Sequence, residues 1–493
     1  MQKLFLKGLG ITLLLNLLVK PATIFLVDIR MQNVLGADDY GVFQVMLDFT
    51  FLFSMILDMG MTNYMTRLIA QYPHMIQKYS NRLFTMRLVL VMAYCLLSMG
   101  MFVLLQFIVP TKISMDWMWI LLILIIHQIN IISVNYVRAY TGGLLKFGLD
   151  ALLSVIERSV YFVLGCLLLY GQFIEPITLP LFITVFVTSS TLSLIAAIII
   201  YVRLVAFPKL HWNFVFFRSI FRQSFPYAIL VILMMLTVRM NTVLLGSLSP
   251  DGQVKQQVAY YVQSFRLLDA CWMFGVLFGS ILLPVFSRVL KEKLSTTGIM
   301  TSALNLLISG GLLMIAFTVG LKEIIFNLLY KDVSYYSYNS WIFLSMTFIP
   351  MCFTIVFGTL LTANKSMRKL NQIAFIGLMT MIALNFLLVP SLGAVGSAIA
   401  LFSSQLVIGI LQYWEVRYNM KHRLARFTWT KLSLLGVVLG AVLFLELTTT
   451  ISPLFYMLLL GAVWVMLVFG LKIIDIKSML TLLTKTASPE KNS

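Results

Sequence analysis

The stretch LDFTFLFSMILDMGMTNYMTR, residues 47–67, decides the class of fold, because it is apolar along almost its whole length yet contains Asp48 and Asp58. A helix of about 20 apolar residues crosses the ~30 Å hydrocarbon core of a membrane. Similar runs recur along the chain, in which 60% of the residues are hydrophobic and only 11% are charged. Soluble domains carry about a quarter charged residues. The sequence therefore predicts an all-α polytopic membrane protein without a soluble domain.

The apolar runs predict about 14 transmembrane helices. We place them at residues 8–30, 42–62, 83–109, 115–138, 148–170, 180–202, 225–247, 258–284, 299–319, 340–361, 370–390, 392–414, 432–450 and 452–471.

The net charge of +18 is explained by membrane topology, and nucleic acid is not an expected partner. Of the 36 lysines and arginines, we assign five to the interior of spans, and most others to the terminal segments or to loops and span ends on the same side as the termini. The opposite loops hold Lys112, Lys255, Lys322 and Lys331. By the positive-inside rule both termini are cytoplasmic, and anionic membrane lipids are natural partners.

Enzymatic chemistry finds no support in the sequence. The expected loops are no longer than about 22 residues, so a membrane glycosyltransferase or polymerase would lack an outer domain, and GxxxxGK[ST], HExxH and GxSxG motifs are missing. The four cysteines fall in spans without CxxC spacing, which predicts free thiols and no metal site. We interpret the Asp38-Asp39 pair as part of a turn, although it could mimic an acidic metal-binding motif.

An internal repeat relates residues 39–68 to residues 260–289. At one constant offset Tyr40 matches Tyr261, Asp48 matches Asp269 and Arg67 matches Arg288. Copies separated by an even number of spans share their orientation, so the repeat predicts two like-oriented six-helix bundles around a central cleft, followed by two extra helices. The predicted parts are a first bundle (1–204), an amphipathic cytoplasmic linker (205–224), a second bundle (225–414), and helices 13–14 with a tail (415–493).

Charged residues inside the spans are the candidate site. The basic ones are Lys20, Arg30, Arg158, Arg239 and Arg266, and the candidate coupling or gating carboxylates are Asp48, Asp58 and Asp269. A charge that faces lipid costs several kcal/mol, so each should face the cleft or an oppositely charged partner. Internal pairing of all these charges is the alternative to a role in binding.

The three carboxylates have different expected roles. Asp269 follows Arg266 by three residues on one helix face, which favours a structural ion pair. Asp48 has no such partner in its own helix and is expected to be the more functional of the two. Asp58 is expected to pair with a basic residue at an inner gate.

Several motifs resemble the polysaccharide transporter family, the O-antigen flippase branch of the multidrug/oligosaccharidyl-lipid/polysaccharide (MOP) exporter superfamily. They are LGADDYGVFQ (35–44), LDMGMTNYMTR (57–67), ILLPVFSR (281–288) and NFLLVPSLGAVGSAIA (385–400). In the last motif Pro390 should end a helix, Gly393 should permit a tight turn, and Gly396 should permit close helix packing. The chain departs from many relatives at Asn241, where they carry an acidic residue, so an ion-coupling role at that position is in doubt.

The resemblance implies a MATE-like fold and a flippase in the bacterial cytoplasmic (inner) membrane, with no catalytic residues and no cofactor beyond a coupling proton or sodium ion. Its cargo would be an undecaprenyl-pyrophosphate-linked oligosaccharide for O-antigen or other surface polysaccharide. Polysaccharide polymerase and glycosyltransferases are further expected partners. The five basic residues would then contact the pyrophosphate, because arginine matches phosphate with two parallel hydrogen bonds. A cation-coupled multidrug exporter of the same superfamily is the alternative, and it would favour acidic sites around a cationic drug.

Overall fold

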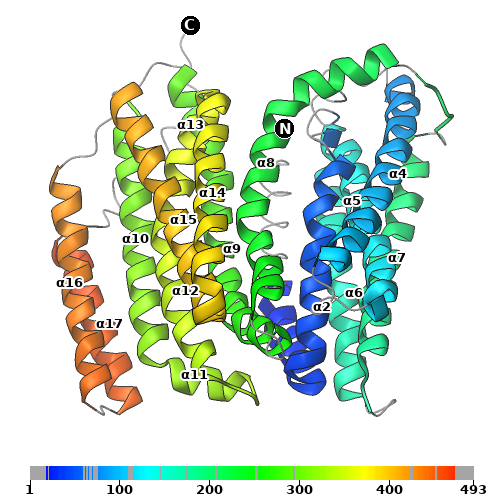
Figure 1. Ribbon diagram of the computed structural model, residues 1–493. Coiled ribbons are helices and arrows are strands. Elements are labelled where there is room, and N and C mark those ends of the chain that lie inside the picture. Colours follow the sequence, from blue (N-terminus) through cyan, green and yellow to red (C-terminus); the bar gives the residue numbers. More distant parts are fainter. Residues whose placement is uncertain are drawn as a thin grey trace, which may run out of the picture. The chain divides into compact units, whose positions relative to one another are not determined.

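The computed structural model describes residues 18–19, 21–58, 61–62, 65, 69, 76–108, 115–144, 146–171, 176–205, 208–212, 214–249, 254–291, 295–420, 426–449, 452–471 and 473. Within these ranges the regular elements are all helices (Figure 1). Eleven of them are long and apolar enough to cross a membrane. The predicted all-α polytopic membrane protein is therefore confirmed.

These eleven helices correspond to eleven of the fourteen expected spans. The first expected span, residues 8–30, lies mostly outside the described residues. The second and eighth lie on α2 (Ile29–Asp58) and α9 (Val254–Lys291), which carry Asp48 and Asp269 respectively.

The chain folds into two compact units. Unit 1 comprises Met1–Arg266, Leu329–Asp332 and Asn385–Ser397, and unit 2 comprises Leu267–Leu328, Val333–Leu384 and Ala398–Ser493. Besides α2 and the first part of α9, the helices of unit 1 are η1 (Ile24–Asp28), α4 (Ile76–Ile108), η3 (Met115–Trp117), α5 (Met118–Gly143), α6 (Phe147–Tyr170), α7 (Leu179–Leu204) and α8 (Phe214–Leu248).

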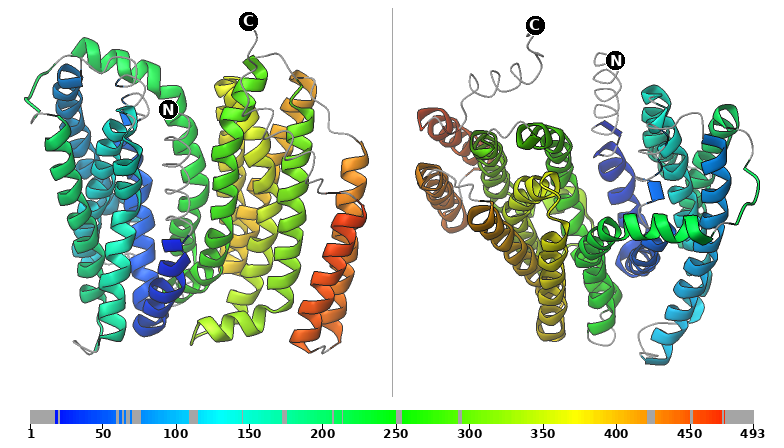
Figure 2. Two further views of the ribbon diagram at one scale, coloured as in Figure 1. Left: turned by 180° about the vertical axis from the view of Figure 1, so that it is seen from behind. Right: turned by 90° about the horizontal axis from the view of Figure 1, so that it is seen from above.

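In unit 1, α7 packs against both α5 and α6, while α2 packs against α4, α5 and α8 (Figures 1 and 2). Buried apolar side chains of α4, α5 and α7 form one core cluster with Met61, Met65 and Ile69. Within it the rings of Tyr140 and Tyr201 meet edge to face, with centroids 5.1 Å apart. This packing fixes α5, which carries several residues of the site described below.

Helix α2 contains the turn that the sequence predicts between the first two spans. Gly36 has φ 80° and ψ 171°, which are not helical values, so α2 consists of two helical segments joined at this residue. Glycine adopts positive φ without the steric cost that a Cβ atom brings. Asp38 and Asp39 are exposed in the first turn after Gly36, where the positive end of the helix dipole favours carboxylates. These positions agree with the turn interpretation.

The remaining helices belong wholly or mainly to unit 2. They are α10 (Thr297–Gly320), α11 (Lys322–Leu329), α12 (Tyr335–Phe353), η4 (Thr354–Gly358), α13 (Thr359–Ala363), α14 (Met367–Leu392), α15 (Ala394–Trp414), η5 (Glu415–Asn419), α16 (Arg426–Thr448) and α17 (Pro453–Gly470).

The last two helices are attached to α10 by packing and by hydrogen bonds. Helix α10 packs against α12, α16 and α17. From α17, the Tyr456 hydroxyl donates to the Ala316 carbonyl at 2.5 Å, and the Trp464 ring N–H donates to the Ser309 carbonyl at 2.9 Å. All four cysteines of the chain are free, as predicted.

The NFLLVPSLGAVGSAIA motif forms the junction between α14 and α15. Gly393 has φ 55°, as the expected tight turn requires. A Cβ atom on Gly396 would lie 2.6 Å from the Leu388 carbonyl oxygen, so the expected close packing is also confirmed. The prediction that Pro390 ends the helix is wrong, because α14 continues to Leu392. Proline removes one backbone donor but leaves the following residues free to stay helical, and transmembrane helices tolerate this.

Candidate functional site

A continuous series of polar contacts runs through unit 1, and we call it the polar chain. Its members are Tyr161, Asp28, Arg266, Tyr40, Gln44, Asp48 and Arg239.

The first part of the polar chain is centred on Asp28, the last residue of η1. The Tyr161 hydroxyl on α6 donates to Asp28 Oδ1 at 2.8 Å. The other carboxylate oxygen lies 3.6 Å from Nη1 of Arg266, a residue 238 positions away on α9. Asp28 is therefore a buried anion shared between a phenol and a guanidinium.

The second part follows one face of α2. Tyr40, Gln44 and Asp48 are spaced four residues apart, so their side chains lie one above the other along the helix. Arg266 Nη2 donates to the Tyr40 hydroxyl at 3.0 Å and to Gln44 Oε1 at 3.1 Å. Gln44 then donates from Nε2 to Asp48 Oδ2 at 3.0 Å. A single glutamine therefore joins the Arg266 guanidinium to the Asp48 carboxylate.

The last part joins α2 to α8. Arg239 Nη1 donates to Asp48 Oδ1 at 3.0 Å, and its guanidinium lies over the Phe51 ring, 5.0 Å from the centroid. The Asp48 side chain is 3% exposed, whereas that of Arg239 is 27% exposed. The Asp48 carboxylate is therefore buried within the protein, while part of the Arg239 guanidinium remains accessible.

The polar chain contains internal ion pairs between its charged residues, which we considered above as the alternative to a role in cargo binding. Its two arginines are matched by Asp28 and Asp48, so their charges are balanced in this conformation. A phosphate could replace either carboxylate, because both present two acceptor oxygens to a guanidinium. The contact of Arg266 with Asp28 joins two helices, whereas the predicted pairing with Asp269 stays within one helix.

Of the other predicted site residues, Arg158 lies close enough to Asp28 and Arg266 for their charges to interact. Arg158 pairs with its neighbour Glu157 at 3.4 Å. Arg30 is exposed, and Asp269 is half-buried on the part of α9 that belongs to unit 2. Lys20 lies outside the described residues.

Asn241 belongs to a separate buried network of uncharged groups. Its Nδ2 donates to the Tyr261 hydroxyl at 2.8 Å and to the Ser397 carbonyl at 3.0 Å. Asn385 donates to Asn241 Oδ1 at 2.7 Å. The amide that stands in place of a carboxylate is thus used to connect α8, α9, α14 and α15.

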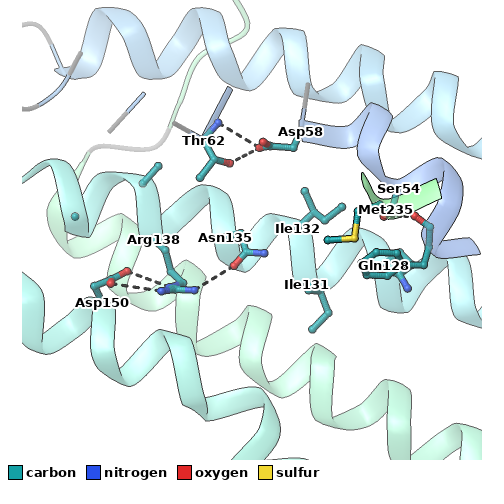
Figure 3. Close-up of a pocket in the computed structure, with 13 residues that line it drawn as sticks. Ser54, Asp58, Thr62, Gln128, Ile131, Ile132, Asn135, Arg138, Asp150 and Met235 are labelled. Atoms are coloured by element: carbon teal, nitrogen blue, oxygen red, sulfur yellow. Dashed lines mark hydrogen bonds and ion pairs between the residues drawn. The ribbon is translucent and has the colours of Figure 1, made fainter. Parts of the chain in front are cut away.

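Next to the Asp48–Arg239 end of the polar chain, unit 1 contains a cavity of about 500 Å³. We call it the α2–α5 cavity, because most of its lining comes from those helices (Figure 3). The lining residues are Phe51, Ser54, Asp58, Thr62, Gln128, Ile131, Ile132, Asn135, Arg138, Ala139, Gly142, Asp150 and Met235.

One wall of the cavity is an ion pair between α5 and α6. Arg138 contacts both oxygens of Asp150, with Nε at 3.0 Å and Nη2 at 3.4 Å, and its Nη1 donates to Asn135 Oδ1 at 3.4 Å (Figure 3). A two-contact pair of this kind fixes the orientation of the guanidinium plane as well as its position.

Asp58 lines the cavity from α2. Its Oδ1 accepts hydrogen bonds from the backbone N–H and the hydroxyl of Thr62. Arg87 of α4 is close enough to Asp58 for their charges to attract; it also donates to Ser133 at 3.5 Å and lies over the Tyr136 ring.

Sequence reasoning missed most of this cavity. Arg87 and Arg138 were counted with the basic residues that set the topology. Gln128 and Asn135 are uncharged, although their spacing of seven residues in HQINIISVN places them on one helix face. That polar stripe in an apolar helix is the signal that could have found them.

Solved structures share this fold over most of their length. The lipid II flippase MurJ, in an inward closed conformation, has a TM-score of 0.68 at 13% identity, covering 97% of this chain and 99% of that one. An inward-facing multidrug resistance MATE family transporter of the MOP superfamily has a TM-score of 0.61 at 13% identity, covering 81% and 94%. A MOP superfamily transporter from Pyrococcus furiosus has a TM-score of 0.55 at 14% identity, covering 84% and 98%. The chain therefore has the fold of MOP superfamily transporters.

The family follows from the sequence comparison. The model of the family described as "Polysaccharide biosynthesis protein" matches residues 5–290, more than half of the chain. The chain belongs to this family, which agrees with the resemblance noted from its motifs. A comparison with curated protein sequences found no match.

Proposed function

We propose that this chain is a flippase that moves an undecaprenyl-pyrophosphate-linked oligosaccharide across the bacterial cytoplasmic membrane. The observation that carries the proposal is the polar chain, in which two arginines are held beside carboxylates in a member of a polysaccharide biosynthesis family. The transport would proceed by alternating access and would supply O-antigen or another surface polysaccharide. Both termini would be cytoplasmic, and a polymerase and glycosyltransferases would act on the same lipid-linked sugar.

The chemistry of the cargo fits the partly exposed arginines. A pyrophosphate carries about two negative charges and must leave the headgroup layer to cross the membrane, so a site inside the protein has to compensate those charges. Arg239 and Arg266 are buried enough to act in a low dielectric, but 27% and 17% of their side-chain surfaces remain exposed. Asp28 and Asp48 would neutralise them between transport cycles, and the phosphate would take over those contacts when cargo binds.

A cation-coupled multidrug exporter remains the second candidate, because Asp48 and Asp58 are intramembrane carboxylates. In that case a carboxylate should be available to a cationic drug or to a coupling proton or sodium ion. Asp48 instead accepts hydrogen bonds from Arg239 and Gln44. This arrangement favours an anionic cargo, which would compete for the arginine and not for the aspartate.

The test is translocation of a fluorescent lipid-linked oligosaccharide in proteoliposomes by an Arg239→Ala/Arg266→Ala variant. We expect a loss of translocation of at least about tenfold, since each lost charged contact accounts for about 1.5–3 kcal/mol. Lysine at both positions should restore only part of it, because lysine cannot make the two-contact interaction. Wild-type translocation by the double alanine variant, at matched amounts of folded protein, would remove the basis of the proposal.

A further inference from the structure

The α2–α5 cavity begins where the polar chain ends. Phe51, which lies under the Arg239 guanidinium, lines the cavity. Met235, one helical turn before Arg239 on α8, lines it too. A ligand whose charged group lies at Arg239 could therefore extend into this cavity without a break.

The lining changes from cationic to amide-rich and acidic along this path. On α2, Asp48, Phe51, Ser54 and Asp58 follow one another at near-helical spacing over about 15 Å, at 1.5 Å per residue. On α5, Gln128 and Asn135 are two turns apart on the facing wall (Figure 3). The same topology that places the termini in the cytoplasm places the Asp58 end of this path on the cytoplasmic side.

Gln128 points to a ligand most directly. It is 2% exposed and lines the cavity, and its amide has no hydrogen bond with any residue that the structure describes. The Nδ2 group of Asn135 is likewise unused within the described part of the chain, because only its Oδ1 accepts, from Arg138. Both amides line the cavity, so their unused groups can bond a polar molecule inside it.

The charges of the lining residues indicate which kind of polar molecule the cavity can bind. The charge of Arg138 is compensated by Asp150, and Arg87 lies close enough to Asp58 for their charges to attract. The lining therefore offers no uncompensated cation to a phosphate. It offers carboxylate and amide oxygens that accept, amide N–H groups that donate, and an apolar wall of Phe51, Ile132 and Met235. Hydroxyl groups on a ring with an apolar face match all three features.

We propose that the α2–α5 cavity is a sugar subsite, which holds the first sugars of the head group while Arg239 holds the pyrophosphate. The inference rests on the proposed flippase function and adds to it a preference for one class of head-group sugar. Neutral sugars are preferred over uronic acids, because Asp58 and Asp150 already compensate the cations beside the cavity and leave none for the carboxylate of a uronic acid. Gln128 and Asn135 are the residues that bond the sugar hydroxyl groups.

The experiment measures binding of three probes to the purified full-length protein in nanodiscs. The probes are undecaprenyl pyrophosphate, the same lipid carrying N-acetylglucosamine, and the same lipid carrying glucuronic acid. For the wild type we expect the N-acetylglucosamine lipid to bind about tenfold more tightly than the lipid without sugar, and the glucuronic acid lipid to gain little. The Gln128→Met and Asn135→Leu variants should each lose about 3- to 10-fold of the sugar gain, the effect of one hydrogen bond. Their affinity for undecaprenyl pyrophosphate itself should stay unchanged.

Two further variants are measured: a matched control for the glutamine substitution, and a variant that removes one negative charge from the cavity. Gln405→Met replaces another buried glutamine, on the part of α15 in unit 2, and should keep the full sugar gain. Asp58→Asn should narrow the difference between the glucuronic acid and N-acetylglucosamine lipids, which a purely structural role of Asp58 would not do. Melting curves of each variant show that the folded protein is being compared.

Each outcome decides something. An equal sugar gain in the wild type, Gln128→Met and Asn135→Leu would overturn the sugar subsite and leave the flippase proposal standing. A sugar difference that Asp58→Asn does not narrow would overturn the charge preference. Failure of the wild type to bind any of the three lipids would refute the flippase proposal and the subsite together.

Discussion

The Asp48→Asn substitution tests how the polar chain is held together. Asp48 receives two donors, with Gln44 Nε2 on one oxygen and Arg239 Nη1 on the other, both at 3.0 Å. Asparagine has almost the same shape but only one acceptor oxygen, so its NH₂ group must face one of these donors. Gln44 cannot relieve the conflict by rotating its amide, because its Oε1 already accepts from Arg266.

The expected loss of stability follows from the burial of the two partners. Breaking a buried ion pair by removing one charge costs about 3–5 kcal/mol. Because Arg239 is 27% exposed, water can compensate part of the lost contact, and we expect the lower end, about 3 kcal/mol. Thermal unfolding in detergent, followed by circular dichroism, should show a clearly lower midpoint for Asp48→Asn.

Two further variants make this prediction specific. Asp39→Asn changes an exposed carboxylate on the same helix, and a surface substitution of this kind should stay within about 0.5 kcal/mol of the wild type. The Asp48→Leu/Arg239→Met variant removes both charges, which is often neutral for a buried pair, and should recover most of the loss. An Asp48→Asn protein as stable as the wild type, or a double variant no better than Asp48→Asn, would refute the reasoning.

Two more predictions concern packing and topology. Gly396→Ala should destabilise the protein by about 1–3 kcal/mol, the usual cost of overpacking, because its Cβ atom would lie 2.6 Å from the Leu388 carbonyl oxygen. The control Gly440→Ala, at a position with open space around it, should be neutral or slightly stabilising. Equal melting temperatures of the two variants would argue against the close packing at Gly396. A single cysteine at Lys331, in a protein without its native cysteines, should react with an impermeant thiol reagent from outside the cell, and one at Arg218 only after permeabilisation. The reverse pattern would contradict the topology.

The fold could be predicted from the sequence because its determinants are local along the chain. Apolar runs mark spans wherever they occur, and the turn at Gly393 and the packing of Gly396 follow from the absence of a Cβ atom. Pro390 was misjudged because proline only removes one hydrogen bond, and the sequence does not reveal whether neighbouring helices support the next turn. Local rules therefore predict which helices exist more accurately than they predict the residue at which each helix ends.

The site could be predicted only in part, because its contacts join residues far apart in the chain. Helix spacing pairs Arg266 with Asp269, but the structure places it on Asp28, 238 residues away. Likewise, Asp48 has no cationic partner at helical spacing on α2, and it pairs with Arg239 on α8. The polar residues were therefore recognisable as important, whereas their partners depended on tertiary packing.

Gln128 was missed for a different reason. An uncharged amide inside a span is a weaker sequence signal than a charge, and its significance comes from the cavity it faces and from the hydrogen bond it lacks within the described structure.

The most direct test of the account is transport by the wild-type protein alone, reconstituted in liposomes and offered two cargoes. One is a fluorescent undecaprenyl-pyrophosphate-linked oligosaccharide in the outer leaflet, whose inward passage is read by protection from a quencher, and the other is a cationic dye such as ethidium. The account predicts protein-dependent movement of the lipid-linked sugar, inhibited by undecaprenyl pyrophosphate, and no transport of the dye. Movement of the dye under an ion gradient, without movement of the lipid-linked sugar, would contradict it.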